Sequence, residues 1–237
     1  MTSTAGTTDE QQSAVHRITL PHNRIELTLH RFAEGEPALR PLLLIHGLGE
    51  AAIGPQGPWQ DWRGPIWALD LTGHGASTVP KGGGYTCEIL MSDVDIALEF
   101  LAAEYPDAPP ATLHGRGLGA YLALMAAGSR PSVVGGVVLA DGPGIAGGGP
   151  SFVSQTAVRP VVTGQPTPDP FALLELSCDV RPPDYAQSFV HLLLGASPME
   201  MPLVVTARVR PPWLEAVARE PGVVAETDAE AFARYSA

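Results

Sequence analysis

Two side chains at the ends of apolar runs could take part in chemistry. His46 directly follows the apolar run 42–45, and an imidazole in that place could act as a general base if it faces a pocket. It could equally serve the fold by hydrogen-bonding to neighbouring loops. Arg116 lies between two glycines and could bind a carboxylate or a phosphate through paired hydrogen bonds, or it could pair with a surface acid. What each group does depends on the elements that position it.

Short apolar runs predict the strands that carry these residues. The run 42–45 is apolar on both faces and is bounded by Pro41 and Gly47, which is typical of a central strand covered by helices on both sides. We expect strands at residues 15–20, 25–31, 42–45, 66–71, 112–113, 133–139, 203–205 and 223–224. We expect helices from the capping residue Thr86 to 101 and at 118–127, 171–178, 184–194 and 211–217. Strands that alternate with helices predict a mostly parallel sheet flanked by helices.

The composition of the chain argues against several classes of function. The 237 residues carry a net charge of −11, so the sequence lacks the basic surface that binding to nucleic acid or to anionic membranes requires. No apolar run approaches the ~20 residues that span a bilayer. Residues 1–12 are polar and carry no secretion signal, so we expect a disordered tail and a cytoplasmic location. Cys87 and Cys178 lack metal-site spacing and are expected to stay reduced, and we expect no metal and no cofactor.

Three local motifs follow one another along the chain. The strand 42–45 ends in His-Gly, and a second strand leads into Asp-x-x-Gly-His-Gly-x-Ser at 70–77. The third motif is Gly-x-Gly-x-Gly at 115–119, where a strand turns sharply into a helix. Together these motifs resemble the α/β-hydrolase superfamily over residues 15–224. The resemblance implies an α/β-hydrolase fold, with a mostly parallel sheet flanked by helices.

The resemblance also implies a catalytic triad, from which this sequence departs. In the superfamily the third motif is the nucleophile elbow G-x-S-x-G, with serine at the tip of the turn. Gly117 stands at that tip and has no nucleophilic atom. Arg210 stands where the triad acid is expected, and no histidine follows His191, although the triad histidine should follow the last strand. We therefore expect a divergent member that lacks the Ser-Asp/Glu-His triad, a pseudoenzyme.

The oxyanion hole implied by the resemblance does not depend on side chains, because backbone N–H groups build it. Leu118, which follows the elbow tip, would supply one N–H, and Leu48 or Gly49 would supply the other. The crevice at the ends of the strands could then hold a carbonyl or an anion. The expected ligand-binding residues are Gly47, Leu48, Gly49, Arg116, Gly117 and Leu118.

Two kinds of function stay open at this point. The favoured one is a non-hydrolytic protein that binds a small carbonyl or anionic ligand, or a protein partner, with no nucleic acid and no membrane and with homo-oligomer formation left open. The alternative is an enzyme, such as a lyase, isomerase, cyclase or atypical hydrolase, that uses the retained amides with His46 or Asp141 as a proton-transfer group. Asp141 follows a strand at which some superfamily members carry the triad acid, and it could otherwise be a turn residue.

One stretch interrupts the alternation of strands and helices. We expect residues 13–237 to form one domain, in which 142–200, rich in glycine and proline at its start, is a lid or cap insertion over the strand ends. The alternative is a loop followed by two helices that pack on the domain.

Overall fold

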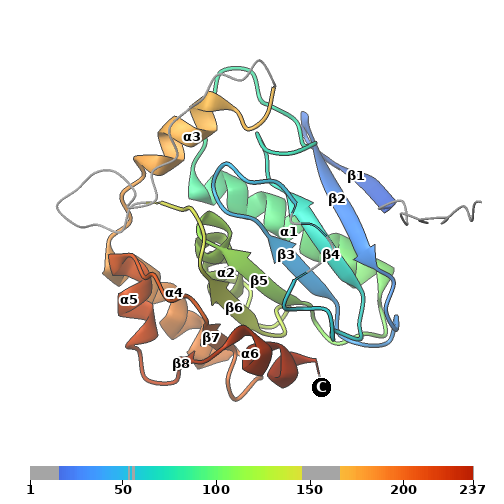
Figure 1. The fold of residues 1–237 in the computed structure, drawn as a ribbon, viewed down its shortest axis with the longest axis vertical. Coiled ribbons are helices and arrows are strands. Elements are labelled where there is room, and N and C mark those ends of the chain that lie inside the picture. Colours follow the sequence, from blue (N-terminus) through green and yellow to red (C-terminus); the bar gives the residue numbers. More distant parts are fainter. Residues whose placement is uncertain (1–15, 53, 55–56, 146–165, 237) are drawn as a thin grey trace, which may run out of the picture.

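The described part of the chain contains one eight-stranded sheet, in the order β1-β2-β4-β3-β5-β6-β7-β8 (Figure 1). The structure is a computed structural model, and it describes residues 16–52, 54, 57–145 and 166–236. The strands are β1 (His16–His22), β2 (Ile25–Ala33), β3 (Leu42–Ile45), β4 (Ile66–Asp70), β5 (Thr112–Arg116), β6 (Val137–Ala140), β7 (Leu203–Val205) and β8 (Val224–Ala225). The β1–β2 and β2–β4 pairs are antiparallel and all other neighbours are parallel, which confirms the mostly parallel sheet.

The centre of the sheet brings two of the predicted motifs together. All four residues of β3 are buried, as the unbroken apolar run predicts. The parallel pairing of β3 with β5 sets Ile45 opposite Gly115. His46 and Arg116 therefore lie at the same edge of the sheet, where the carboxyl ends of the parallel strands meet.

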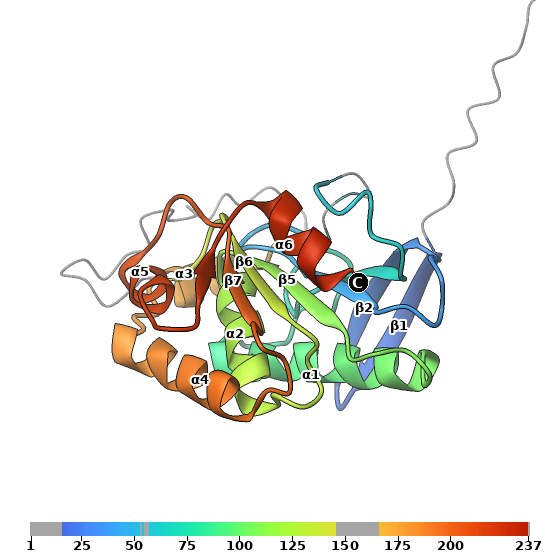
Figure 2. The same cartoon turned by 90° about the horizontal axis from the view of Figure 1, so that it is seen from below.

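Helices cover the sheet on both faces. They are α1 (Cys87–Glu104), α2 (Leu118–Ser129), α3 (Pro170–Ser177), α4 (Pro183–Ala196), α5 (Pro212–Ala218) and α6 (Asp228–Tyr235). The first begins where the sequence predicts, because the Ile89 N–H donates to the Thr86 hydroxyl at 3.3 Å. Figure 2 shows α1, α2 and α4 below the sheet and α6 above it.

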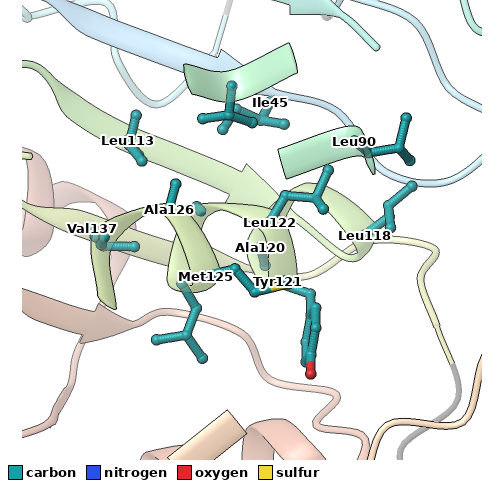
Figure 3. Packing of buried hydrophobic residues seen from close by; sticks show 14 of the residues in the cluster. Ile45, Leu90, Leu113, Leu118, Ala120, Tyr121, Leu122, Met125, Ala126 and Val137 are labelled. Carbon is teal, nitrogen blue, oxygen red and sulfur yellow. The ribbon is translucent and has the colours of Figure 1, made fainter. Parts of the chain in front are cut away.

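The main core lies between the sheet and α2. Eleven of the twelve residues of α2 are buried, as expected for a helix of small and apolar residues packed directly on strands. Figure 3 shows side chains of this helix among Ile45, Leu113 and Val137 of the sheet and Leu90 of α1. A second cluster on the opposite face joins the sheet to α6 and includes Trp59 and Phe232. The strand ends that carry the candidate site are thus held from both sides.

Several predicted boundaries differ from those in the structure. The strand predicted at 133–139 begins only at Val137, because Val133 ends an exposed turn and residues 134–136 are irregular. The strand predicted at 112–113 continues to Arg116. The helix α6 was not predicted, although it starts with a capping box between Thr227 and Glu230. No helix among the described residues is long and apolar enough to cross a bilayer, and the cytoplasmic location stays a prediction.

The segment 142–200, expected to be a lid, is described only in part, because residues 146–165 lie outside the described residues. The whole of the predicted tail 1–12 also lies outside them. Within the described part, Glu175 of α3 accepts hydrogen bonds from the N–H groups of Gly84 and Tyr85 at 3.0 and 2.5 Å. The next helix, α4, packs against α2 and α5 and buries Val190 and Leu193. It therefore belongs to the helical layer on the sheet, and the lid function of the segment stays a prediction.

Candidate functional site

The turn between β5 and α2 forms the centre of the candidate site. Gly117 lies alone between the end of the strand and the start of the helix, with φ 51° and ψ −109°. That φ belongs to the left-handed region, which glycine adopts at little cost. Two residues later, a Cβ on Gly119 would lie 2.4 Å from the carbonyl oxygen of Ile45. Glycine at this second position therefore allows α2 to start directly against β3.

The two amides expected to form an oxyanion hole do converge on one oxygen. The Leu48 N–H donates to the carbonyl oxygen of Pro143 at 2.8 Å, and the Leu118 N–H donates to the same oxygen at 2.9 Å. This is the arrangement in which two backbone donors hold a carbonyl oxygen or an oxyanion. The acceptor is a carbonyl of the chain itself. A ligand oxygen can reach both amides only when the Pro143 carbonyl moves away.

The tip of the turn and the Pro143 carbonyl are in direct steric contact. A Cβ on Gly117 would lie 2.0 Å from that oxygen and 2.5 Å from the carbonyl carbon of Gly142. No side chain, serine included, fits at this position while Pro143 stays in place. No sequence motif signals this contact, because it joins two backbone segments that are far apart in the chain.

His46 is held by backbone groups on both sides of its ring. Its Nε2 accepts from the Leu71 N–H at 3.1 Å, so the proton is on Nδ1, which donates to the Gly47 carbonyl at 2.7 Å. The side chain is buried, and burial lowers the pKa of His46, with the nearby positive charge of Arg116 acting in the same direction. Of the two interpretations of this residue, the structure favours the one in which it serves the fold.

Arg116 pairs with an acid that the sequence analysis did not single out. Its guanidinium donates to Glu50 at 3.0 Å through Nη1 and to the backbone carbonyl of Asp141 at 3.0 Å through Nε. Glu50 also accepts from the Gly47 N–H at 2.9 Å. A ligand carboxylate at Arg116 therefore has to compete with Glu50 for the guanidinium.

The carboxylate of Asp141 holds the loop that follows β7. It accepts from the N–H of Arg208 at 2.9 Å through Oδ2 and from the N–H of Val209 at 2.8 Å through Oδ1. Arg210, expected in place of the triad acid, donates instead to the Ala207 carbonyl. His191 lies on the surface of α4 and pairs with Glu220 at 3.0 Å. Neither of these two residues joins the group around Gly117 through a described hydrogen bond.

A pocket of about 360 Å³ adjoins the turn. We call it the elbow pocket, and its walls include Arg116, Gly117, Asp141, Pro143, Val209 and Trp213. Most of the lining is apolar side chains and backbone, with Arg116 and Asp141 as the charged residues. Such a lining, with few polar groups, is typical of small-molecule sites. Among the described residues no group of histidine, cysteine and acidic side chains could hold a metal ion.

Comparison with known proteins agrees with the mostly parallel α/β fold. The model of the alpha/beta hydrolase family matches residues 42–237, and the chain belongs to this family. No curated protein matches the sequence.

Several solved structures share the fold. The thioesterase domain from the curacin biosynthetic pathway is 17% identical with a TM-score of 0.58, and the match covers 94% of this chain and 98% of that domain. A haloalkane dehalogenase from Agrobacterium tumefaciens C58 is 15% identical with a TM-score of 0.59, covering 91% and 88%. A bacterial membrane phospholipase A is 18% identical with a TM-score of 0.52, covering 90% and 79%. At these identities the likeness extends to the fold alone.

Proposed function

We propose that this chain is a non-hydrolytic member of the family that binds a small carbonyl or anionic ligand in the elbow pocket. The observation that carries the proposal is the Pro143 carbonyl between the N–H groups of Leu48 and Leu118. This carbonyl lies where the side chain of an elbow serine would have to start, since a Cβ at Gly117 would be 2.0 Å from it. A hydrolase that forms an acyl-enzyme needs that side chain and needs the amides free for the substrate.

The chemistry of the ligand follows from what the two amides already hold. Both N–H groups donate to a carbonyl oxygen, so an amide, an ester or a carboxylate oxygen is an equivalent acceptor. The start of α2 adds the positive end of a helix, which favours an anion. Binding then exchanges the Pro143 carbonyl for the ligand oxygen, and the apolar walls of the elbow pocket receive the rest of the ligand.

A titration monitored by the two amide resonances tests this exchange. Acetate and acetamide serve as probes of the anionic and the neutral carbonyl class. We expect saturable shifts of the Leu48 and Leu118 N–H signals with at least one probe. Saturable binding that leaves both signals unmoved, or no binding of either probe, would contradict the proposal.

Hydrolysis is tested separately with a panel of activated esters and thioesters. We expect no turnover above buffer. Val209→Trp introduces a large ring at the wall of the elbow pocket, because the Val209 side chain lines the pocket and, at 65% exposed, has room for it. Val133→Trp is the matched control, an exposed valine before β6 and thus at the opposite edge of the sheet. Turnover that Val209→Trp abolishes and Val133→Trp retains would overturn the non-hydrolytic function.

The alternative is an enzyme that polarises a carbonyl through the same two amides without a covalent step. Both N–H groups converge on one oxygen at 2.8 and 2.9 Å, and this supports the alternative because two such donors can polarise a substrate carbonyl. A proton-transfer group is also needed, and both His46 and Asp141 already hold backbone groups. The alternative therefore requires Asp141 to leave its loop, and a pH–rate profile that Asp141→Asn abolishes would support it.

A further inference from the structure

His114 is a buried histidine that no part of the proposed function uses. It lies in β5 on the face toward α6, where its ring is 5.6 Å from that of Trp59 and 5.3 Å from that of Phe232. The residue is 2% exposed. In the described part of the chain, neither ring nitrogen has a hydrogen-bond partner. Burial lowers the pKa of His114 to about 4, so the neutral ring presents one donor and one acceptor at neutral pH.

Two further polar atoms near His114 also lack a hydrogen-bond partner within the described part of the chain. The Thr206 hydroxyl and Asp228 Oδ1 are buried and have no hydrogen-bond partner among the described residues. Together with His114 and Trp59 they line one pocket of about 350 Å³, which we call the His114 pocket. It shares the wall formed by Arg116 and Asp141 with the elbow pocket, but its other walls come from the loop of Trp59, the end of β7 and the start of α6.

The absence of hydrogen bonds among these groups excludes a formed triad. A hydroxyl, an imidazole and a carboxylate could suggest nucleophilic catalysis, but that requires them to hydrogen-bond to one another. Here both ring nitrogens of His114, the Thr206 hydroxyl and Asp228 Oδ1 are all unpartnered among the described residues, so the three groups surround a space and do not form a chain. A buried polar group without a partner costs about 1–3 kcal/mol, and buried groups in proteins almost always find a partner. A molecule placed between the three would satisfy all of them.

We propose that the His114 pocket binds a small neutral molecule that both donates and accepts hydrogen bonds, an amide or an alcohol with a flat apolar part. The polar wall offers both roles, since Asp228 accepts, the Thr206 hydroxyl does either, and His114 does both. Trp59 supplies an aromatic surface for the flat part. Charged ligands fit less well, because an anion would face the carboxylates of Asp141 and Asp228, and an ion of either sign would lose its hydration beside the buried neutral groups of His114 and Thr206.

Side-chain ¹⁵N resonances of the histidines give a direct test. Benzamide and benzyl alcohol are the neutral probes, and benzoate and benzylammonium are charged analogues of similar shape. We expect saturable shifts of the His114 ring nitrogens with at least one neutral probe, at lower concentration than with either charged one. No shift with the neutral probes, as for a cavity that holds water alone, would overturn the proposal, and so would tighter binding of a charged analogue.

Two variants locate the binding. Thr206→Val removes one hydroxyl at nearly constant volume, and we expect neutral-probe affinity to fall about tenfold, the effect of one lost hydrogen bond. Trp213→Phe alters the elbow pocket and the contact with Tyr121, but Trp213 does not line the His114 pocket, so the affinity should stay unchanged. Equal affinity in Thr206→Val and the wild type would overturn the placement. The His114→Leu variant adds a check by thermal melting, because the neutral probes should no longer raise its Tm.

Discussion

At the residue scale, Gly117 and Pro143 depend on each other. The left-handed φ of 51° allows glycine at the tip, and the 2.0 Å distance from a Cβ to the Pro143 oxygen requires it. The same oxygen satisfies the N–H groups of Leu48 and Leu118, which would otherwise need water or a ligand. The Pro143 carbonyl thus occupies the space that a side chain at position 117 would need, and it accepts both N–H groups that could otherwise hold an oxyanion.

The variant Gly117→Ser tests this dependence. We expect the free energy of unfolding to fall by about 2–4 kcal/mol, because the serine adds left-handed backbone strain and collides with Pro143. Chemical denaturation measures the loss, and hydrogen exchange should show reduced protection of the Leu48 and Leu118 amides. Gly195→Ser is the matched control in α4, where a Cβ meets nothing within 4 Å and should change stability by less than about 1 kcal/mol. A stable Gly117→Ser protein with both amides protected would contradict the described contact.

Sequence alone could locate this site but could not show what fills it. The motif around Gly117 places a turn at the end of a strand, and the amides of Leu48 and Leu118 converge as expected. The acceptor could not be predicted, since any residue type can present a backbone carbonyl. The pairing of Arg116 with Glu50 was equally out of reach, because a surface acid anywhere in the chain could have met that guanidinium.

At the element scale, the loop after β7 takes its shape from a neighbouring strand end. Asp141 follows β6, and its carboxylate accepts N–H groups from Arg208 and Val209 in the next loop. This loop in turn brings Val209 and Pro211 to the wall of the elbow pocket. The carboxylate of Asp141 therefore positions a loop that forms part of the wall of the elbow pocket.

The variant Asp141→Asn tests whether the carboxylate holds the loop after β7. The amide group accepts only through its oxygen, so the Arg208 N–H, which the carboxylate meets through both oxygens, loses one of its two acceptors and faces an NH₂ group instead. We expect the free energy of unfolding to fall by about 1–2 kcal/mol and hydrogen exchange of the Arg208 and Val209 amides to accelerate. Asp107→Asn, at an exposed position in the turn after α1, should leave both quantities unchanged. Unaltered exchange of the two loop amides in Asp141→Asn would show that the carboxylate does not hold the loop.

Elements were predicted well where the pattern was long or unbroken. The run 42–45 and the helix that follows Thr86 are correct, whereas α6 was missed. That helix has eight residues, and only Ala231, Phe232 and Tyr235 are buried, so its apolar face is too short to stand out from a polar segment. Missing it also hid Asp228 and with it the polar wall of the His114 pocket.

At the scale of the whole molecule, ionisable groups are buried on several elements and respond to pH in opposite senses. Burial lowers the pKa of His74 to about 3, so the folded protein keeps this ring neutral between that pH and 6.5, where the unfolded chain binds a proton. Stability therefore falls as pH falls through this range.

Asp93 affects the pH dependence of stability in the other direction. Its carboxyl in α1 is buried, and burial raises its pKa from 3.8 to about 7 despite hydrogen bonds from Thr72.

The variant Asp93→Asn isolates the contribution of the Asp93 carboxyl to the pH dependence of stability. Between about pH 4 and 7 the folded protein holds the Asp93 proton and the unfolded chain has lost it, so the folded state binds more protons and its stability decreases as pH rises. One such group contributes a slope of at most ~1.4 kcal/mol per pH unit. Asparagine keeps the shape and can bond to both Thr72 atoms without titrating. We therefore expect the wild type to lose stability relative to Asp93→Asn as the pH is raised from 4 to 7.

The quantity to measure is the difference in unfolding free energy between the two proteins at each pH, because the contributions of His74 and the other histidines cancel in it. The exposed Asp61→Asn removes one carboxyl in the same way and serves as the control. A burial-driven shift predicts a sloping difference for Asp93→Asn that levels off above about pH 7. A difference that is flat between pH 4 and 7, or that slopes the opposite way, would mean that the hydrogen bonds from Thr72 outweigh burial and keep Asp93 ionised in the folded protein.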